Sequence, residues 1–189
     1  MPKLEIERPL DTLVPAAAAT LVSLLSKDPD IPDIRWAAYM LATVQHECAN
    51  TWKPIVERGT PEYCRKYDPG TKLGTALGNT QPGDGYRFRG RGYVQITGRT
   101  NYARLGRMIG RGDDLVRTPE LATDHDIAYR IMSVGMRAGA FTGKKLSDYI
   151  SAGKCDYKNA RRIINGVDRA DLIAGYAAKF ERILNSTRS

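Results

Sequence analysis

The sequence predicts a mainly α-helical domain with a loop-rich middle, and three observations lead to this prediction. Apolar residues recur at helical spacing over most of the chain. Glycine and proline interrupt this pattern between residues 50 and 98, where short turns are expected. The length of 189 residues suits one domain, and neither a linker nor an internal repeat divides it. We therefore expect a single domain over residues 1–189, with room for a small β-hairpin in its middle.

The first helix is expected over residues 11–27, with Asp11 as its N-cap and Pro15 in its first turn. A second helix over 32–49 is apolar nearly all round, which predicts a buried central helix. In the middle segment we expect turns at 68–70 and 82–85, and short extended pieces near 86–88 and 93–97. Further helices are predicted over residues 100–109, 120–139, 144–151, 156–165 and 169–185.

The last predicted helix is amphipathic, because Ile173, Phe180 and Leu184 share one face and basic residues lie nearby. We expect that apolar face to dock on the core of the domain. A basic amphipathic tail that disturbs membranes is the alternative.

The composition is that of an ordinary folded protein, with 42% hydrophobic and 26% charged residues. It excludes collagen-like, disulfide-rich and wholly disordered classes, and no apolar run approaches the roughly 20 residues of a membrane-spanning helix. The formal net charge of +8 favours a polyanionic partner. Nucleic acid, an anionic membrane surface and an acidic cell-wall polymer all meet that condition, and charge alone does not separate them.

The three cysteines, Cys48, Cys64 and Cys155, match neither a zinc-binding spacing nor a CxxC redox motif. We expect reduced thiols, with a Cys48–Cys64 disulfide as the lesser alternative. The apolar stretch from Ala16 to Leu25 follows acidic residues rather than a compact basic segment. We therefore interpret it as part of a helix and not as a signal peptide.

The first candidate for chemistry is Glu47, near the C-terminal end of the apolar helix predicted over 32–49. Burial and the negative end of the helix dipole both raise the pKa of a carboxyl group. A carboxyl that stays protonated near neutral pH suits general-acid catalysis, whereas a glutamate that caps the helix or pairs with an arginine is the plain alternative. The pair His46-Glu47 does not begin an HExxH zinc motif, because position 50 is Asn50. We expect no metal and no cofactor.

Two further carboxylates, Glu57 and Glu62, follow in the loop-like segment. A pair of carboxyl groups on either side of a cleft is the minimum equipment of a glycosidase. A helix-borne acid and a loop-borne base would lie in different environments, which separates their pKa values. The plain alternative for each loop glutamate is an exposed surface residue.

A basic, glycine-rich and aromatic run extends over residues 87–102. It passes into an alternating Tyr-Val-Gln-Ile-Thr sequence, which predicts a strand that buries Val94 and Ile96 and presents Gln95 and Thr97 to a groove. Such a surface suits carbohydrate. The run is also typical of RNA- or DNA-binding segments, and under that hypothesis the contacts come from Arg87, Arg89, Arg91 and Arg99.

Three motifs in this order carry a resemblance to a known family. They are His46-Glu47 at the end of an apolar helix, the run from Gly90 to Arg99, and the segment from Arg161 to Gly166. Together they resemble glycoside hydrolase family 19, the chitinase-like family, and within it the short bacteriophage endolysins that cut peptidoglycan. The likeness covers roughly residues 30–180. It implies a lysozyme-like, two-lobed and largely helical fold with a cleft between the lobes.

Carried over by position, the resemblance implies that Glu47 is the general acid and Glu57 the second carboxylate, which activates water. Glu62 is the reserve for that second role. Our candidates for substrate binding, water positioning or support of the acid are His46, Tyr86, Gln95, Thr97, Asn101, Arg162 and Asn165.

The chain departs from the plant-type pattern of the family. Cys48 stands where a threonine is usual, and Tyr93-Val94 replaces a Pro-Ile pair. The extra loops of the plant enzymes are also absent. These departures favour peptidoglycan over chitin as the substrate.

The resemblance thus leads us to expect a phage-type endolysin that hydrolyses the β-1,4 glycan strands of peptidoglycan and lyses the host cell. We expect a monomer that contacts the anionic outer-membrane surface and binds no nucleic acid. It would be made in the host cytoplasm without a signal peptide and reach the wall in the periplasm through a separate membrane-permeabilising protein. The alternatives are a chitinase, a lytic transglycosylase that needs a single acid/base glutamate, and a nucleic-acid-binding domain.

Overall fold

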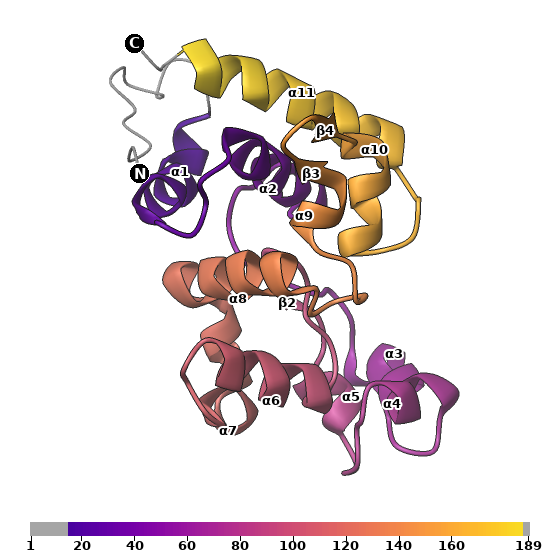
Figure 1. Ribbon diagram of the computed structural model, residues 1–189. Coiled ribbons are helices and arrows are strands. Elements are labelled where there is room, and N and C mark those ends of the chain that lie inside the picture. The colour runs from indigo at the N-terminus through magenta and orange to yellow at the C-terminus, as the bar shows by residue number, and fades with distance from the viewer. Residues whose placement is uncertain (1–14, 187–189) are drawn as a thin grey trace. The chain divides into compact units, whose positions relative to one another are not determined.

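A computed structural model describes residues 15–186, and the described chain forms two compact units (Figure 1). Unit 1 contains the described residues up to Lys53 and those from Gly135 onward, and unit 2 is Pro54–Val134. Most described residues are helical, and the strands among them form two short pairs. The mainly α fold class is therefore confirmed.

Unit 1 consists of helices and one small hairpin. Its elements are η2 (Ala16–Ala18), α1 (Ala19–Lys27), α2 (Ile34–Glu47), the last turn of α8 (His125–Ala138), α9 (Leu146–Tyr149), β3 (Ile150–Ser151), β4 (Lys154–Cys155), α10 (Tyr157–Ala160), η5 (Arg161–Ile163) and α11 (Ala170–Ser186).

Helix α2 is the centre of unit 1, as its apolar sequence predicts. The Asp33 side chain accepts the backbone N–H of Arg35 and caps its N-terminus. Residues 37–44 are all buried. Helix α11 packs along α2 and buries its own apolar face there, with Ile173, Ala177, Phe180 and Leu184 (Figure 1). The docking of the last helix is confirmed, and its apolar face is not available to a membrane.

Unit 2 contains shorter helices and one long-range strand pair. Its elements are β1 (Ile55–Val56), α3 (Pro61–Cys64), η3 (Arg65–Tyr67), α4 (Lys72–Ala76), α5 (Asp84–Arg87), β2 (Arg91–Gly92), α6 (Arg99–Met108), α7 (Asp114–Arg117), η4 (Pro119–Thr123) and most of α8. Strands β1 and β2 are antiparallel, with Ile55 opposite Gly92 and Val56 opposite Arg91.

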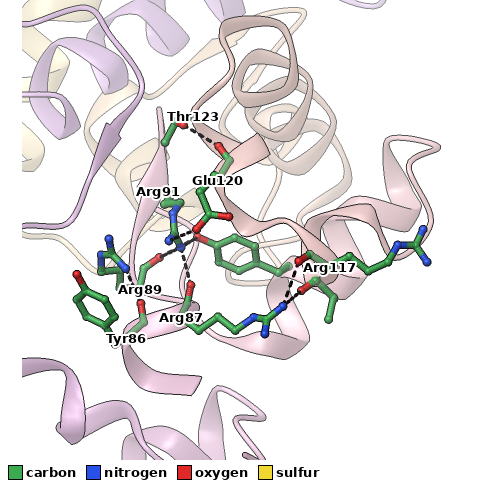
Figure 2. A network of polar contacts seen from close by, with 9 residues as sticks. Tyr86, Arg87, Arg89, Arg91, Arg117, Glu120 and Thr123 are labelled. Carbon is green, nitrogen blue, oxygen red and sulfur yellow. Dashed lines mark hydrogen bonds and ion pairs between the residues drawn. The ribbon is translucent and has the colours of Figure 1, made fainter. Parts of the chain in front are cut away.

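A buried arginine anchors β2 in unit 2, and Figure 2 shows its contacts. Arg91 is 2% exposed; its Nη1 donates to the Arg87 carbonyl and to Tyr102 Oη, and its Nη2 pairs with Glu120 at 3.1 Å. Nearby, Arg87 donates to the carbonyls at the end of α7. Arg87 and Arg91 thus tie β2 and the end of α7 together within unit 2.

The N-terminal helix begins later than the sequence predicts. Pro15 precedes η2 and accepts the N–H of Ala18, so Pro15 is not in the first turn of an α-helix. α-Helical structure starts at Ala19. The predicted cap Asp11 lies outside the described residues.

The prediction of extended segments near residues 86–88 and 93–97 is wrong. Residues 84–87 form α5, because the Asp84 carboxylate accepts backbone N–H groups just before that helix and so stabilises its start. The second piece is a turn closed by two backbone hydrogen bonds between Arg91 and Ile96. Gly92 and Gln95 both have positive φ, at 86° and 51°, so the chain reverses instead of extending.

The helices predicted over 120–139, 144–151 and 156–165 are shorter than expected. Asp124 accepts the N–H groups of Asp126 and Ile127 and starts α8 afresh after η4. A hairpin of β3 and β4 separates α9 from α10, with Gly153 at φ 74° in its turn. The hairpin with two paired strands therefore occurs here, whereas in the loop-rich middle Arg91 and Ile96 form an isolated antiparallel bridge.

Cys48 and Cys64 are both buried and are not joined to each other, so the Cys48–Cys64 disulfide is not formed. Among the described residues, no helix has the length and apolar character needed to cross a membrane.

Candidate active site

Glu47 is the last residue of α2, where the chain leaves the helix abruptly. Ala49, Asn50 and Trp52 all adopt positive φ, an arrangement that is strained for residues other than glycine. Trp52 is buried and meets Phe180 of α11 edge-on, with 5.7 Å between the ring centroids. The strained turn is thus anchored in the core of unit 1, and it fixes the end of α2 that carries Glu47.

The carboxylate of Glu47 pairs with a buried arginine. Arg161 Nη1 lies 2.5 Å from Glu47 Oε1, and the side chains are 3% and 18% exposed. Arg161 Nε also donates to the Asp168 carbonyl, which holds the guanidinium in place. No other hydrogen bond to the Glu47 carboxylate is found among the described residues. The sequence predicts apolar surroundings for Glu47, but the structure places one fixed cation beside its carboxylate, so the arginine pairing given as the plain alternative is present.

Sequence reasoning selected Arg162 and Asn165 in this segment and missed Arg161. Arg162 is exposed and its Nε donates to Asn159, while the Asn165 side chain accepts the N–H of Gly166 in its own turn. Helical spacing contained the missing signal. Tyr157, Ala160 and Arg161 fall at i, i+3 and i+4, and all three are buried, so Arg161 is the inward-facing residue of the pair.

Glu57 follows β1 in unit 2 and is held by two neutral donors. Its Oε2 accepts the N–H of Gly90 at 3.0 Å, and its Oε1 accepts the hydroxyl of Tyr67 at 3.1 Å. The backbone N–H of Glu57 in turn donates to the Gly90 carbonyl. Burial, together with the nearby Glu57 charge, raises the pKa of Tyr67, so this hydroxyl keeps its proton and remains a donor.

Gly90 separates Glu57 from Gln95 with little space to spare. A side chain at Gly90 would begin 2.9 Å from Gln95 Oε1 and 3.3 Å from Glu57 Oε2. The Gln95 amide nitrogen donates to the carbonyls of Ile55 and Gly92 and so braces β1 against β2. Only its oxygen remains for other contacts, so Gln95 does not present a whole amide group as the predicted strand would have done.

Two other predicted site residues are linked to Gln95 by a chain of hydrogen bonds. The Thr97 hydroxyl donates to the Gln95 carbonyl, and the Asn101 side chain donates to the Thr97 carbonyl. The structure therefore brings together Glu57, Gln95, Thr97 and Asn101 in unit 2. It also adds Tyr67 and Gly90, which sequence reasoning missed because their partners are distant in the chain.

The remaining candidates lie elsewhere. His46 is half-buried beside Glu47 in the chain, and Tyr86 is exposed beneath the guanidinium of Arg89. Glu62 is exposed in the first turn of α3. Hydrogen bonds from its own backbone N–H and from the Thr60 hydroxyl hold the pKa of Glu62 below its usual value, as in a residue that caps a helix. Such a setting fits a surface residue better than a catalytic base.

Each unit thus contains one half-buried carboxylate with fixed partners: Glu47 has a cation in unit 1, and Glu57 has neutral donors in unit 2. A carboxyl group with an unengaged oxygen can deliver a proton, and a second carboxylate can accept one from water. Among the described residues, no group of three His, Cys, Asp or Glu side chains is arranged to hold a metal ion.

Comparison with solved structures finds chitinases whose fold is similar to that of this chain. Chitinase C of Streptomyces griseus is 17% identical, with a TM-score of 0.67 over 98% of this chain and 78% of that one. A mutant of chitinase C is 19% identical, with a TM-score of 0.55 over 89% of this chain and 81% of that one. No family model matches the chain.

Curated sequences match over short segments. An acidic endochitinase of Solanum chilense is 51% identical over 45 residues, which are 23% of this chain and 18% of the relative. A glycosyl hydrolase family 19 domain-containing protein of Haemophilus influenzae is 50% identical over 34 residues, 18% of this chain and 17% of the relative. The matches span less than a fifth of these relatives. The chain therefore has the fold of the family 19 chitinases, and the resemblance of its motifs to glycoside hydrolase family 19 is confirmed.

Proposed function

We propose that the protein is a glycoside hydrolase of the endolysin type that cleaves the β-1,4 glycan strands of peptidoglycan. The observation that carries the proposal is the pair of half-buried carboxylates, Glu47 and Glu57, each fixed by partners of different charge in a chitinase-like fold. The assignment of Glu47 as the acid and Glu57 as the base follows the resemblance of their motifs to the family, and the contacts of each carboxylate hold its side chain in place.

In the proposed reaction, Glu47 protonates the oxygen of the leaving sugar. Arg161 binds Oε1, which fixes the side chain and leaves Oε2 to carry the proton. Glu57 accepts a proton from water, which attacks the anomeric carbon while the bond to the leaving oxygen breaks. The Tyr67 hydroxyl and the Gly90 N–H orient the Glu57 carboxylate for this step. The product would be the inverted anomer.

The net charge of +8 supports contact with anionic wall polymers and the outer-membrane surface. We propose that the enzyme acts as a monomer on the wall and that a separate membrane-permeabilising protein gives it access from the host cytoplasm. Expression in the cytoplasm alone should then leave cells intact, and coexpression with a pore-forming protein should lyse them. Lysis by the enzyme alone would contradict this part of the proposal.

Mass spectrometry of soluble products from purified peptidoglycan tests the reaction. The wild type, Glu47→Gln and Glu57→Gln are compared, with Glu62→Gln as the matched control on an exposed glutamate. Hydrated reducing ends that disappear in the first two variants but persist in the control support the proposal. We expect losses of about 10³-fold, the range for removal of a general acid or base. Circular dichroism should show that each variant remains folded.

Other outcomes of this experiment would support one of the alternative functions. Anhydro ends with Glu57→Gln still active would indicate a lytic transglycosylase, and loss in Glu62→Gln with retention in Glu57→Gln would reassign the base. The names of the relatives make chitin the second candidate substrate. Cleavage of a chitin oligomer with no release from peptidoglycan would favour the chitinase.

A further inference from the structure

We propose that Lys66 and Arg89 form an anion-recognition site beside Glu57 that selects glycans carrying carboxylate groups. This inference rests on the proposed function, because it names the substrate class that the Glu57 centre would take. It arises from two cations and two exposed tyrosine rings that lie next to the partners of Glu57.

Lys66 adjoins the first of these partners. Its Nζ lies 3.5 Å from the centroid of the Tyr63 ring and 4.7 Å from that of Tyr67. Tyr67 is the residue whose hydroxyl donates to Glu57. The Lys66 ammonium group is therefore one side chain removed from the Glu57 carboxylate.

Arg89 adjoins the second partner. It precedes Gly90, whose N–H donates to Glu57. The guanidinium carbon of Arg89 lies 4.0 Å from the centroid of the Tyr86 ring, and its Nη1 donates to the Tyr86 carbonyl. These two contacts fix the direction of the side chain, so Arg89 presents its charge from a defined position.

Neither Lys66 nor Arg89 has a carboxylate within ion-pairing distance in the described part of the chain. Neighbouring arginines differ in this respect, because Arg91 pairs with Glu120 and Arg99 with Asp84. The Glu57 carboxylate is occupied by Tyr67 and Gly90 instead. Two cations thus keep their charge available for an external anion.

The tyrosine rings indicate that the anion belongs to a sugar. Tyr63 is 51% exposed and Tyr86 is 37% exposed, and each is held by a cation–π contact. An exposed ring offers a flat apolar surface with a polar edge, which suits a sugar ring. A neutral chitin chain would leave both cations unused. A peptidoglycan strand carries carboxylates, on its peptide stems or, where the stems are absent, on its lactyl groups.

Charge-neutralising variants test this inference. Lys66→Gln, Arg89→Gln and the double variant are assayed on intact peptidoglycan, on glycan strands stripped of their stems and on a neutral chitin hexamer. Lys72→Gln is the control, since Lys72 is an exposed lysine of the same unit. We expect about fivefold loss of kcat/KM for each single variant on carboxylate-bearing glycans, through KM rather than kcat, with less than twofold change on the hexamer.

The pattern of losses also identifies the carboxylate. A loss confined to intact peptidoglycan assigns it to the stem, and a loss confined to stripped strands assigns it to the lactyl group; both outcomes support the inference. An equal loss on all three glycans, or no loss on either carboxylate-bearing glycan, would overturn it.

Binding separates this inference from the proposed reaction. Calorimetric titration of the wild type with a muramic-acid-containing tetrasaccharide and with chitotetraose requires no turnover. Preference for the first, lost in the double variant, supports the inference even if no glycan is cleaved, in which case only the proposed reaction fails. Equal affinity for the two tetrasaccharides overturns the inference.

Discussion

Each unit contains a carboxylate paired with an arginine, and the two pairs differ in how completely the carboxylate is engaged. In unit 2, Arg99 donates to both oxygens of Asp84 at 2.6 and 2.8 Å, and Thr80 and Gln81 add backbone N–H groups. Asp84 is 2% exposed. In unit 1, Glu47 accepts a single contact from Arg161 and remains 18% exposed.

This difference separates a carboxylate whose two oxygens are both engaged from one that keeps an oxygen outside its ion pair. Burial alone would raise the pKa of Asp84, but Arg99 and the two backbone N–H groups hold it below its usual value. Protonation of Asp84 would sacrifice several hydrogen bonds at once, whereas Glu47 keeps an oxygen outside its ion pair. Pairing with arginine therefore does not by itself argue against catalysis at Glu47, which keeps one oxygen outside the pair.

The largest expected effect is on stability, from Asp84→Asn. Loss of the charge leaves Arg99 without its partner, and we expect a decrease of about 4 kcal/mol in the free energy of unfolding at pH 7. Because the folded pKa lies below the unfolded value, this stabilisation is present above about pH 4 and is lost as the pH falls through the folded pKa. Urea unfolding at pH 7 and pH 3 should show the difference shrinking in acid. Asp113→Asn, in the exposed pair with Arg107, should change stability by less than about 0.5 kcal/mol, and similar losses in both variants would contradict the comparison.

Arg161→Met should decrease stability by about 3 kcal/mol, because it leaves the half-buried Glu47 charge without a partner. Adding Glu47→Gln should restore part of this loss, since the neutral amide needs no cation. Thermal unfolding of the two single variants and the double variant measures the coupling. Arg162→Met is the control on the adjacent exposed arginine and should be near neutral. If the double variant shows no coupling between positions 47 and 161, the contact does not contribute measurably to stability.

Gly90→Ala should decrease activity about 100-fold while leaving the chain folded. The added methyl group would displace the Glu57 carboxylate and the Gln95 side chain, and small misplacements of a catalytic group have effects of this size. Hydrolysis rates and thermal unfolding measure the two effects separately. Gly175→Ala in α11, where nothing lies within 4 Å of the new methyl group, should retain full activity. Full activity in Gly90→Ala would remove Glu57 from the proposed mechanism.

Tyr67→Phe should decrease kcat about fivefold, because it removes one of the two donors to the Glu57 carboxylate, a hydrogen bond of about 1 kcal/mol. The pH profile of kcat should shift along with the rate, which a purely structural hydroxyl would not cause. Tyr176→Phe in unit 1 is the matched control. An unchanged profile would limit Tyr67 to a packing role.

The sequence predicts those features of the fold that depend on local periodicity. The all-round apolar pattern of α2 predicts its burial, and the amphipathic pattern of residues 169–185 predicts the docking of α11. The β1–β2 pair could not be predicted, because each strand has only two residues, too few to show an alternating pattern in the sequence. The two strands are also separated by more than 30 residues.

The candidate site was predictable to a similar extent. The motifs indicate Glu47 and Glu57, but not the partners that distinguish them, because Arg161, Tyr67 and Gly90 are brought into place by tertiary structure. The turn at Gln95, in contrast, could have been predicted from the sequence. Gly92 and Gly98 flank it and both adopt positive φ, so the glycines in this run indicate chain reversal rather than a strand.

The distribution of thiols gives the molecule a separate reporter for the opening of each unit. Cys48 is buried in unit 1, Cys64 is buried in unit 2, and Cys155 is exposed. A thiol reagent would modify Cys155 at once, and would modify each buried thiol only as fast as its own unit opens. Peptide mapping of the modified sites over time would therefore show whether unit 1 or unit 2 is the first to come apart.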